Sequence, residues 1–417
     1  MAYLSKICSK VDARLVYYGL VISQYFSISL TASNGTIYYL MHGITKPWVA
    51  YLGLIGSLTI VLFEFPTGVV ADRIGPSISV AISLLLRGAA ALLVIFCYGP
   101  AMFALITIIS SIGYTFFSGA SEAWIFNSDR SVKKDMNNFF AHSFMMNGTA
   151  KIFGGAVGGL IASSNADIPF ILSGSLLIVT AALFVLYLFM QRERCFNPQV
   201  KSTRKDPDHF ITGMTDTVKI ILTDKVLTLI TVCGTLFIVF SVIPLIYWQP
   251  FFYDASNSMN ALGGIWAVFI AMNLAGSYAS KTSWVKKRGN FSLFKILISL
   301  CGFSLLVSAL TNKILYLSLT SFFAYHFFLG IIGPIRYIII NQRIDDAKRA
   351  SVISFISFSE NFGAIVSFLV FGHLSNIIDL KWILALSTIP LVLALFVATR
   401  LKRCMKCTLP AETKIIF

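Results

Sequence analysis

Charged residues are scarce in this sequence. Lys, Arg, Asp and Glu make up 12% of its 417 residues, whereas 57% are hydrophobic and the mean hydropathy is +0.79. A water-soluble domain could not keep so much apolar surface away from water, so soluble fold classes are excluded. Acidic residues are the scarcer charged type, 18 against 33 basic ones, and the net charge is +15.

The sequence also lacks the motifs of several kinds of chemistry. It has no GxxxxGK(S/T) phosphate loop, so we do not expect it to hydrolyse ATP. The HExxH pattern, the nucleophile elbow and metal-spaced Cys and His residues are absent too. An integral membrane enzyme would need His or Asp residues clustered at one membrane face, and no such cluster is present. We therefore expect a protein that is not an enzyme and holds no cofactor and no metal ion.

Twelve apolar runs extend along the chain, and a helix of about 20 such residues spans a bilayer. This pattern predicts an all-α polytopic membrane protein. The predicted spans are residues 15–41, 47–70, 77–97, 101–128, 138–163, 168–190, 226–252, 259–280, 291–310, 314–340, 351–375 and 382–399.

The basic residues lie mainly on one side of these spans. With both termini in the cytoplasm, 27 of the 33 fall in cytoplasmic segments, and the outward loops hold only Lys46, Lys313 and Lys381. The positive-inside rule explains this bias and fixes the orientation. The charge is thus accounted for without nucleic acid, and we predict a multi-pass protein of a bacterial cytoplasmic (inner) membrane.

A long polar stretch divides the spans into two sets of six. We predict an N-terminal six-helix bundle over 1–190, a cytoplasmic linker with an interfacial helix over 191–224, a C-terminal six-helix bundle over 225–400 and a cytoplasmic tail over 401–417. Charged turns follow the fourth span of each half. Repeated halves of this kind bind a solute between them, near the middle of the membrane.

The sequence EFPTGVVADRIG runs from Glu64 to Gly75, between spans two and three. Gly68 can let two helices approach closely, and Gly75 allows a tight turn its backbone angles. Asp72 and Arg73 can pair across that turn. The string resembles the G-x-x-x-D-R-x-G signature of the major facilitator superfamily, and the twelve spans and central linker extend the resemblance over essentially the whole chain.

The resemblance implies two pseudo-symmetric six-helix bundles, the major facilitator fold, which works by alternating access. In that family the acid and base of this loop join a charge network that locks the outward-facing state. By position, Asp129 and Arg349 would complete the network with Asp72 and Arg73, and we place Arg336, near the inner end of span ten, with these gating residues.

Span five carries AKIFGGAVGG from Ala150. This string resembles a glycine motif in span five of the family's drug and metabolite exporters, and it matches that motif at Gly154, Gly158 and Gly159. Gly155 stands where the motif has proline. The resemblance favours export.

Ionisable residues of both signs lie inside the predicted spans: Glu64, Glu122 and Glu360, and Arg87, Lys151 and Arg336. Each costs about 2.5–3.5 kcal/mol at the bilayer centre, so the helices must turn them toward one another or toward water. They either form structural pairs or act in transport. In the second interpretation the three glutamates are candidates for proton coupling, with Glu360 foremost, and Lys151 and Arg87 contact an anionic substrate.

Further substrate-binding candidates are polar or aromatic residues of spans that line the cavity in this family: Gln24, Thr31 and Asn34 in span one, Thr235 and Trp248 in span seven, and His326 in span ten. The threonines and amides form polar stripes that suit a water-filled cavity. His326 is either a packing residue or a proton relay, and Trp248 either stacks on a solute or anchors the helix at the interface.

These features predict a monomeric secondary transporter that moves a small solute across the bilayer, coupled to protons, as an exporting antiporter. Proton-coupled uptake of an anionic metabolite or an iron–siderophore is the rival hypothesis, because three buried cations suit an anion. A non-transporting sensor would need a further signalling domain. Neither the linker nor the 17-residue tail is large enough to be one.

Overall fold

The computed structural model describes residues 12–191, 219, 221–282, 290–341 and 349–408. Within these residues all regular structure is helical, which confirms the all-α fold class. Helices suit a hydrocarbon solvent because each satisfies its own backbone N–H and C=O groups.

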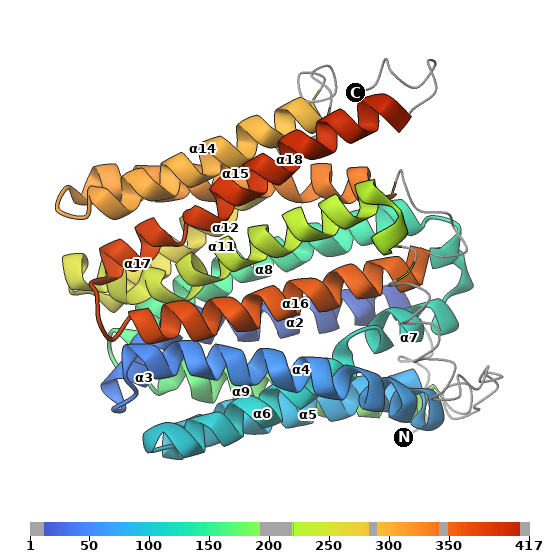
Figure 1. The fold of residues 1–417 in the computed structure, drawn as a ribbon. Helices are drawn as coiled ribbons and strands as arrows, with labels where there is room; N and C mark the ends of the chain where they lie inside the picture. Colours follow the sequence, from blue (N-terminus) through green and yellow to red (C-terminus); the bar gives the residue numbers. More distant parts are fainter. Residues whose placement is uncertain (1–11, 192–218, 220, 283–289, 342–348, 409–417) are drawn as a thin grey trace. The chain divides into compact units, whose positions relative to one another are not determined.

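The helices of the N-terminal part are α2 (Ala13–Ala32), α3 (Gly35–Met41), α4 (Lys46–Ile74), α5 (Pro76–Leu93), η1 (Val94–Phe96), α6 (Gly99–Phe117), α7 (Ala120–Ser128), η2 (Arg130–Lys133), α8 (Met136–Ala162) and α9 (Ile168–Met190). Those of the C-terminal part are α11 (Lys225–Ser256), α12 (Met259–Ala279), α14 (Asn290–Leu310), α15 (Leu315–Asn341), α16 (Arg349–Leu374), α17 (Leu380–Leu386) and α18 (Ile389–Thr408) (Figure 1).

Eleven helical segments of the described residues are long and apolar enough to cross a membrane. The remaining predicted span, 138–163, corresponds to α8. This helix has 27 residues and is long enough at about 1.5 Å per residue, but its Asn, Thr and Lys side chains make it less apolar. The structure is therefore consistent with twelve spans.

Three predicted spans are broken rather than continuous. Span one divides into α2 and α3 at Ser33 and Asn34, and span twelve into α17 and α18 at Ser387 and Thr388. Span four divides into α6 and α7 at Gly119, whose φ of 74° lies where residues with a Cβ are strained. Hydropathy misses such breaks because the residues on both sides are apolar.

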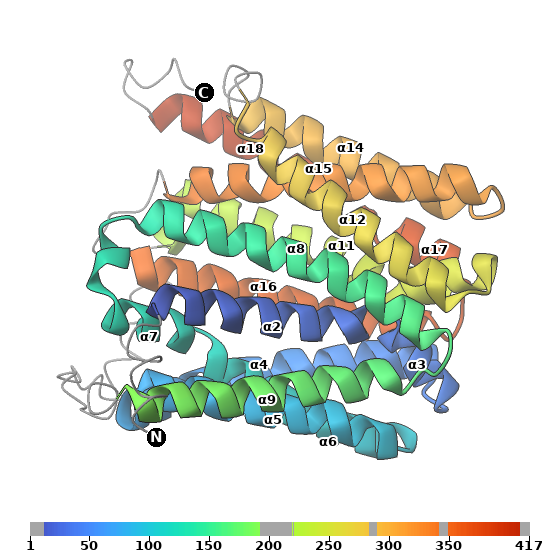
Figure 2. The same cartoon turned by 180° about the vertical axis from the view of Figure 1, so that it is seen from behind.

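The chain forms two compact units. Unit 1 comprises residues 1–48, 55–203 and 257–267. Here α2 packs against α8 and α9, and α5 against α6 and α9 (Figure 2). A buried cluster around Tyr17, Trp124 and Phe184 fills the space between these helices, so α2, α5 and α8 hold their side chains in fixed positions.

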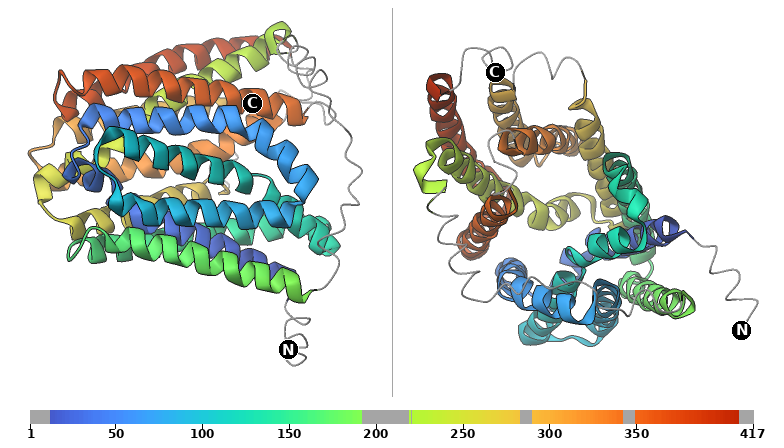
Figure 3. Two further views of the ribbon diagram at one scale, coloured as in Figure 1. Left: turned by 90° about the horizontal axis from the view of Figure 1, so that it is seen from below. Right: turned by 90° about the vertical axis from the view of Figure 1, so that its right-hand side faces the viewer.

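Unit 2 comprises residues 49–54, 204–256 and 268–417. In this unit α11 packs against α16 and α18, and α14 packs against α15 (Figure 3). A layer of buried aromatic side chains, including Phe240, Phe252, Phe322 and Tyr325, joins α11 to α15. The predicted interfacial helix of the linker falls largely outside the described residues, as does the charged turn after span ten.

Candidate functional site

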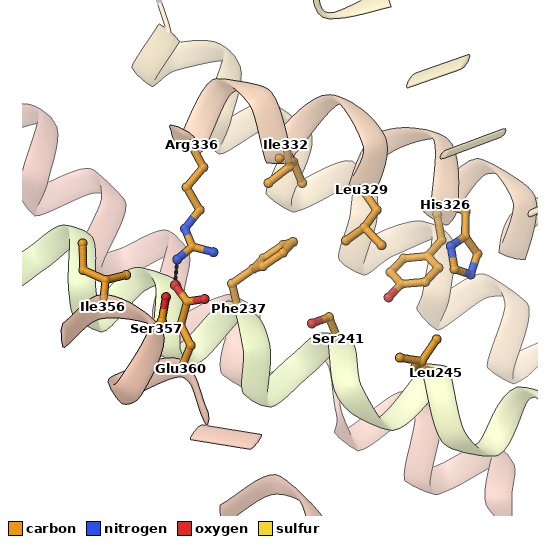
Figure 4. Close-up of a pocket in the computed structure, with 12 residues that line it drawn as sticks. Phe237, Ser241, Leu245, His326, Leu329, Ile332, Arg336, Ile356, Ser357 and Glu360 are labelled. Carbon is orange, nitrogen blue, oxygen red and sulfur yellow. Dashed lines mark ion pairs between the residues drawn. The ribbon is translucent and has the colours of Figure 1, made fainter. Parts of the chain in front are cut away.

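Unit 2 contains a cavity of about 470 Å³ between α11, α15 and α16, a volume that suits a small solute (Figure 4). Its apolar walls are Phe237, Leu245, Leu329, Ile332 and Ile356. Its polar side chains are Ser241, Tyr325, His326, Arg336, Ser357 and Glu360. One cation and one anion among neutral groups give the cavity both donors and acceptors.

Arg336 of α15 and Glu360 of α16 form an ion pair on the wall of this cavity (Figure 4). The two side chains are only 17% and 20% exposed. Within the described residues, Arg336 Nε is buried and has no hydrogen-bond partner. Each charge compensates the other in a poorly solvated place, so removing either charge leaves the other uncompensated at a cost of about 3–5 kcal/mol.

Gly234 of α11 makes room for this pair. A Cβ at Gly234 would lie 2.5 Å from an Arg336 guanidinium nitrogen and 3.2 Å from Glu360 Oε1, which leaves no space for a side chain. Next to it, Thr235 donates to the Thr231 carbonyl over 3.1 Å, and its methyl carbon would lie 2.8 Å from a Cβ at Gly363. Thr235 therefore packs where α11 and α16 meet and does not line the cavity.

His326 lines the same cavity and is held by aromatic rings. Its imidazole stacks on Phe269 with ring centroids 4.2 Å apart, and it meets Phe322 and Tyr325 edge-on. Trp248 also packs on Phe269, with centroids 5.2 Å apart, and is 1% exposed. The structure thus places His326 at the cavity and buries Trp248 among the aromatic residues behind it.

In unit 1, the two cations predicted to bind substrate lie near Tyr25. Lys151 Nζ of α8 is 4.7 Å from the centroid of the Tyr25 ring, and the Arg87 guanidinium of α5 is 6.0 Å from that of Tyr114. Arg87 lies within electrostatic range of both tyrosine hydroxyls. Its Nη1 is buried with no hydrogen-bond partner among the described residues.

The polar residues of the first predicted span, Gln24, Thr31 and Asn34, differ in their hydrogen bonds. The Asn34 amide donates to the Leu30 carbonyl over 3.1 Å and to the Gly158 carbonyl over 3.2 Å, which ties α2 to α8. Thr31 donates to the Ile28 carbonyl within its own helix. Gln24 is 2% exposed, and its amide oxygen has no partner within the described residues. Asn34 and Thr31 therefore donate to structural partners, while the amide oxygens of Gln24 and Asn34 are both buried without a partner among the described residues.

At the predicted cytoplasmic end, Asp129 pairs with Arg14 among the residues that the structure describes. Arg14 Nε donates to Asp129 Oδ2 over 2.8 Å, and the Ser131 backbone and hydroxyl both donate to the other oxygen. Ser131 and Arg14 hold the pKa of the Asp129 carboxyl below its usual value. This contact lies within unit 1 and joins α2 to the turn after α7.

The predicted gate also includes the loop between α4 and α5. Asp72 and Arg73 are exposed, and Gly75 has a φ of 93°, which suits a glycine turn. An added Cβ at Gly68 would meet no described atom within 4 Å, so the close helix approach expected there is not found. Arg349 begins α16, but its side chain lies outside what the structure describes.

The other two intramembrane glutamates differ from Glu360. Glu64 of α4 and Glu122 of α7 are both exposed, and the structure places neither in an ion pair among the described residues. The Glu122 charge acts on the hydroxyls of Tyr17 and Tyr25. Glu122 therefore lies within electrostatic range of Tyr25, the residue that Lys151 contacts.

Among known protein families, the model of the Major Facilitator Superfamily matches residues 17–367. The chain belongs to this superfamily. A relative in Bacillus subtilis (strain 168), described as an uncharacterized MFS-type transporter, YxaM, is 28% identical over 264 residues. The match covers 58% of this chain and 62% of that protein, so the chain spans less than two thirds of the relative's length.

Solved structures share the superfamily fold. A point mutant of the nucleoside transporter NupG matches with a TM-score of 0.75 at 14% identity, covering 94% of this chain and 100% of that one. A bacterial homologue of the iron transporter ferroportin, in an inward-facing state, has a TM-score of 0.70 at 14% identity, covering 94% and 99%. At such identities the likeness concerns the fold alone.

Several residues of these clusters were missed by sequence reasoning. Tyr25, Tyr114 and Gly234 carry no charge, and their spacing resembles that of ordinary membrane helices. Arg14 lies at the start of α2, where the positive-inside rule alone accounts for a basic residue. The opposite charges of Arg336 and Glu360 allow them to pair. A single sequence does not show which of the six charged residues inside the predicted spans form ion pairs.

Proposed function

We propose that this superfamily member is a proton-coupled secondary transporter that exports a small solute by alternating access. The observation that carries the proposal is the Arg336–Glu360 ion pair on the wall of the unit 2 cavity. A carboxylate in such a place can bind a proton in one access state and release it in the other.

Proton binding changes what the cavity presents to a solute. With Glu360 ionised, its charge is compensated by Arg336 and the pair is neutral overall. Protonation of Glu360 removes the negative charge, so the Arg336 guanidinium must find another acceptor or more water. The free energies of the cavity and of its solute are therefore linked to the protonation of one side chain.

Export is the direction that the glycine sequence of α8 supports, through its resemblance to the exporter motif. Cβ atoms at Gly154 and Gly158 would collide with the backbone of α2 at Phe26 and Leu30. These glycines thus allow the close helix contact on which such a motif depends. We further propose that the protein acts as a monomer in a bacterial cytoplasmic membrane, with both termini in the cytoplasm.

A second candidate, proton-coupled uptake of an anionic metabolite or an iron–siderophore, is favoured by a different observation. Arg87 and Lys151 lie against tyrosine rings, and neither forms an ion pair among the described residues. Cations without a carboxylate partner suit a negatively charged cargo.

Transport assays in vesicles of both orientations separate the two candidates. Labelled carboxylates, iron chelates and cationic dyes are offered to inside-out vesicles with an acidic lumen and to right-side-out vesicles in an acidic medium. Proton-coupled export predicts accumulation in the inside-out vesicles that collapses with the gradient. Accumulation in the right-side-out vesicles alone would establish uptake, and transport that ignores the gradient in both would contradict proton coupling.

A further inference from the structure

We propose that Arg87 and Lys151 form an anion-binding site around Tyr25 in unit 1, and that the transported solute carries a carboxylate or phosphate group. The inference rests on the proposed transport function but not on its direction. It is carried by the way in which four helices bring cations, tyrosines and an unsatisfied donor together.

Arg87 is held in position by a glycine of the neighbouring helix. A Cβ at Gly113 of α6 would lie 2.6 Å from Arg87 Cγ, so α6 packs directly on the aliphatic part of this side chain. The guanidinium group then reaches the ring of Tyr114, also on α6. A long cationic side chain confined in this way has little conformational freedom left to lose when it binds a ligand.

The guanidinium group is confined but not satisfied. Arg87 Nη1 is buried and has no hydrogen-bond partner among the described residues. Burying a donor without an acceptor is unfavourable, and more so when the donor is charged. A tyrosine ring attracts a cation but does not replace the oxygen acceptors that guanidinium N–H groups prefer. An anionic oxygen would supply them.

Lys151 of α8 is, like Arg87, a cation close to a tyrosine ring. Its ammonium group lies over the Tyr25 ring of α2 and is half-buried. The aromatic ring attracts the cation without neutralising it, and Lys151 forms no ion pair among the described residues. Lys151 is thus a compact positive charge held against an aromatic ring.

Tyr25 joins the two cations into one site. Its ring contacts Lys151, and its hydroxyl interacts with Arg87 and with the side chain of Asn147. The acid that acts on Tyr25 is Glu122, which is exposed. Tyr25 thus has two cations and one carboxylate among its neighbours, so the balance of charge around it is positive.

This arrangement matches anions with several oxygens. The planar guanidinium group of Arg87 binds carboxylate or phosphate through two parallel hydrogen bonds, and Lys151 adds a point charge. If the cations served only to hold the bundle together, each would be expected to pair with an acid, as Arg336 pairs with Glu360.

The test is equilibrium binding to the purified full chain in nanodiscs of zwitterionic lipid, measured by calorimetry without any gradient. The probes are citrate, inorganic phosphate and, as a cation, choline. We expect citrate or phosphate to bind, and the Arg87→Gln and Lys151→Gln variants to weaken that binding about tenfold or more. Arg87→Lys and Lys151→Arg keep the charge and should recover part of the affinity, which distinguishes a binding role from misfolding.

Two other cations that lie near aromatic rings, outside the proposed site, serve as matched controls. Lys381 lies 5.5 Å from the Trp382 centroid and Arg400 lies 4.8 Å from that of Phe396. Lys381→Gln and Arg400→Gln should bind the anion like the wild type. The proposal is overturned if the wild type binds neither anion, if it binds choline instead, or if Arg87→Gln and Lys151→Gln bind as the controls do. Glu360→Gln should keep anion binding, so a failure of proton coupling would leave this result unchanged.

Discussion

At the scale of single residues, the ion pair of the unit 2 cavity depends on a third position that has no charge. Arg336 belongs to α15 and Glu360 to α16. Both side chains lie next to Gly234 of α11. The absence of a side chain at Gly234 therefore determines where the guanidinium group can go. A residue without polar side-chain atoms thus sets the geometry of a charged pair.

Gly234→Ala should disturb this pair while leaving the fold intact. The new methyl would lie 2.5 Å from the Arg336 guanidinium, which is the flexible end of its side chain and must move. We expect gradient-driven transport to fall about tenfold, with a change in unfolding free energy of about 1–3 kcal/mol or less. Transport rate and thermal unfolding of the same preparation measure both effects.

Gly264→Ala is the control for that substitution. Gly264 lies in α12, and a Cβ there would meet no described atom within 4 Å. This variant should transport normally and be as stable as the wild type or slightly more so, because alanine favours helix. Equal transport by both alanine variants would show that Gly234 does not position the pair.

At the scale of helices, α8 of unit 1 is shaped for contact on two sides. Gly154 and Gly158 face the backbone of α2, whereas Gly155 and Gly159 face the first part of α12. The Trp266 indole of α12 lies against Gly155 and donates to the Lys151 carbonyl over 3.0 Å. The same helix thus packs against two other helices and carries a cation of the proposed anion site.

Gly155→Ala should weaken this packing. The added methyl would overlap the Trp266 ring, and overpacking of this kind costs about 1–3 kcal/mol. The expected result is a lower unfolding temperature of the full chain in detergent. Gly19→Ala in α2 is the matched control, since a Cβ there meets no described atom within 4 Å. An unchanged unfolding temperature for Gly155→Ala would contradict the close contact.

The contact between α2 and the turn after α7 should depend on pH. The Ser131 hydroxyl and Arg14 stabilise ionised Asp129 and lower the pKa of its carboxyl in the folded state. Its contribution to stability is therefore present above the unfolded-state pKa of about 3.9 and is lost as the pH falls through the lower folded-state value.

Asp129→Asn should therefore unfold at a slightly lower temperature than the wild type at pH 7. The difference should shrink as the pH is lowered below about 4, because the wild-type carboxyl becomes protonated. Asp379→Asn removes an exposed carboxylate 3.9 Å from Lys381 and should have little effect at either pH. A difference for Asp129→Asn that grows in acid would contradict this account.

At the scale of the whole molecule, the sequence predicts the fold better than the sites. Hydropathy and charge bias locate the spans because a bilayer imposes length and polarity on every helix. They do not find the breaks at Asn34, Gly119 and Ser387, which depend on local backbone angles. Which charges meet depends on helix rotation and packing, so Arg336 with Glu360, and Asp129 with Arg14, emerge only from the structure.

The central claim is that Glu360 couples transport to protons through its pair with Arg336. Its most direct test is Glu360→Gln in vesicles, measured as gradient-driven accumulation and as counterflow exchange of the same labelled solute. Asp379→Asn is the control, a carboxylate in an exposed ion pair. We predict that Glu360→Gln loses gradient-driven accumulation and keeps exchange, while the control keeps both. Accumulation by Glu360→Gln at the wild-type rate would contradict the claim.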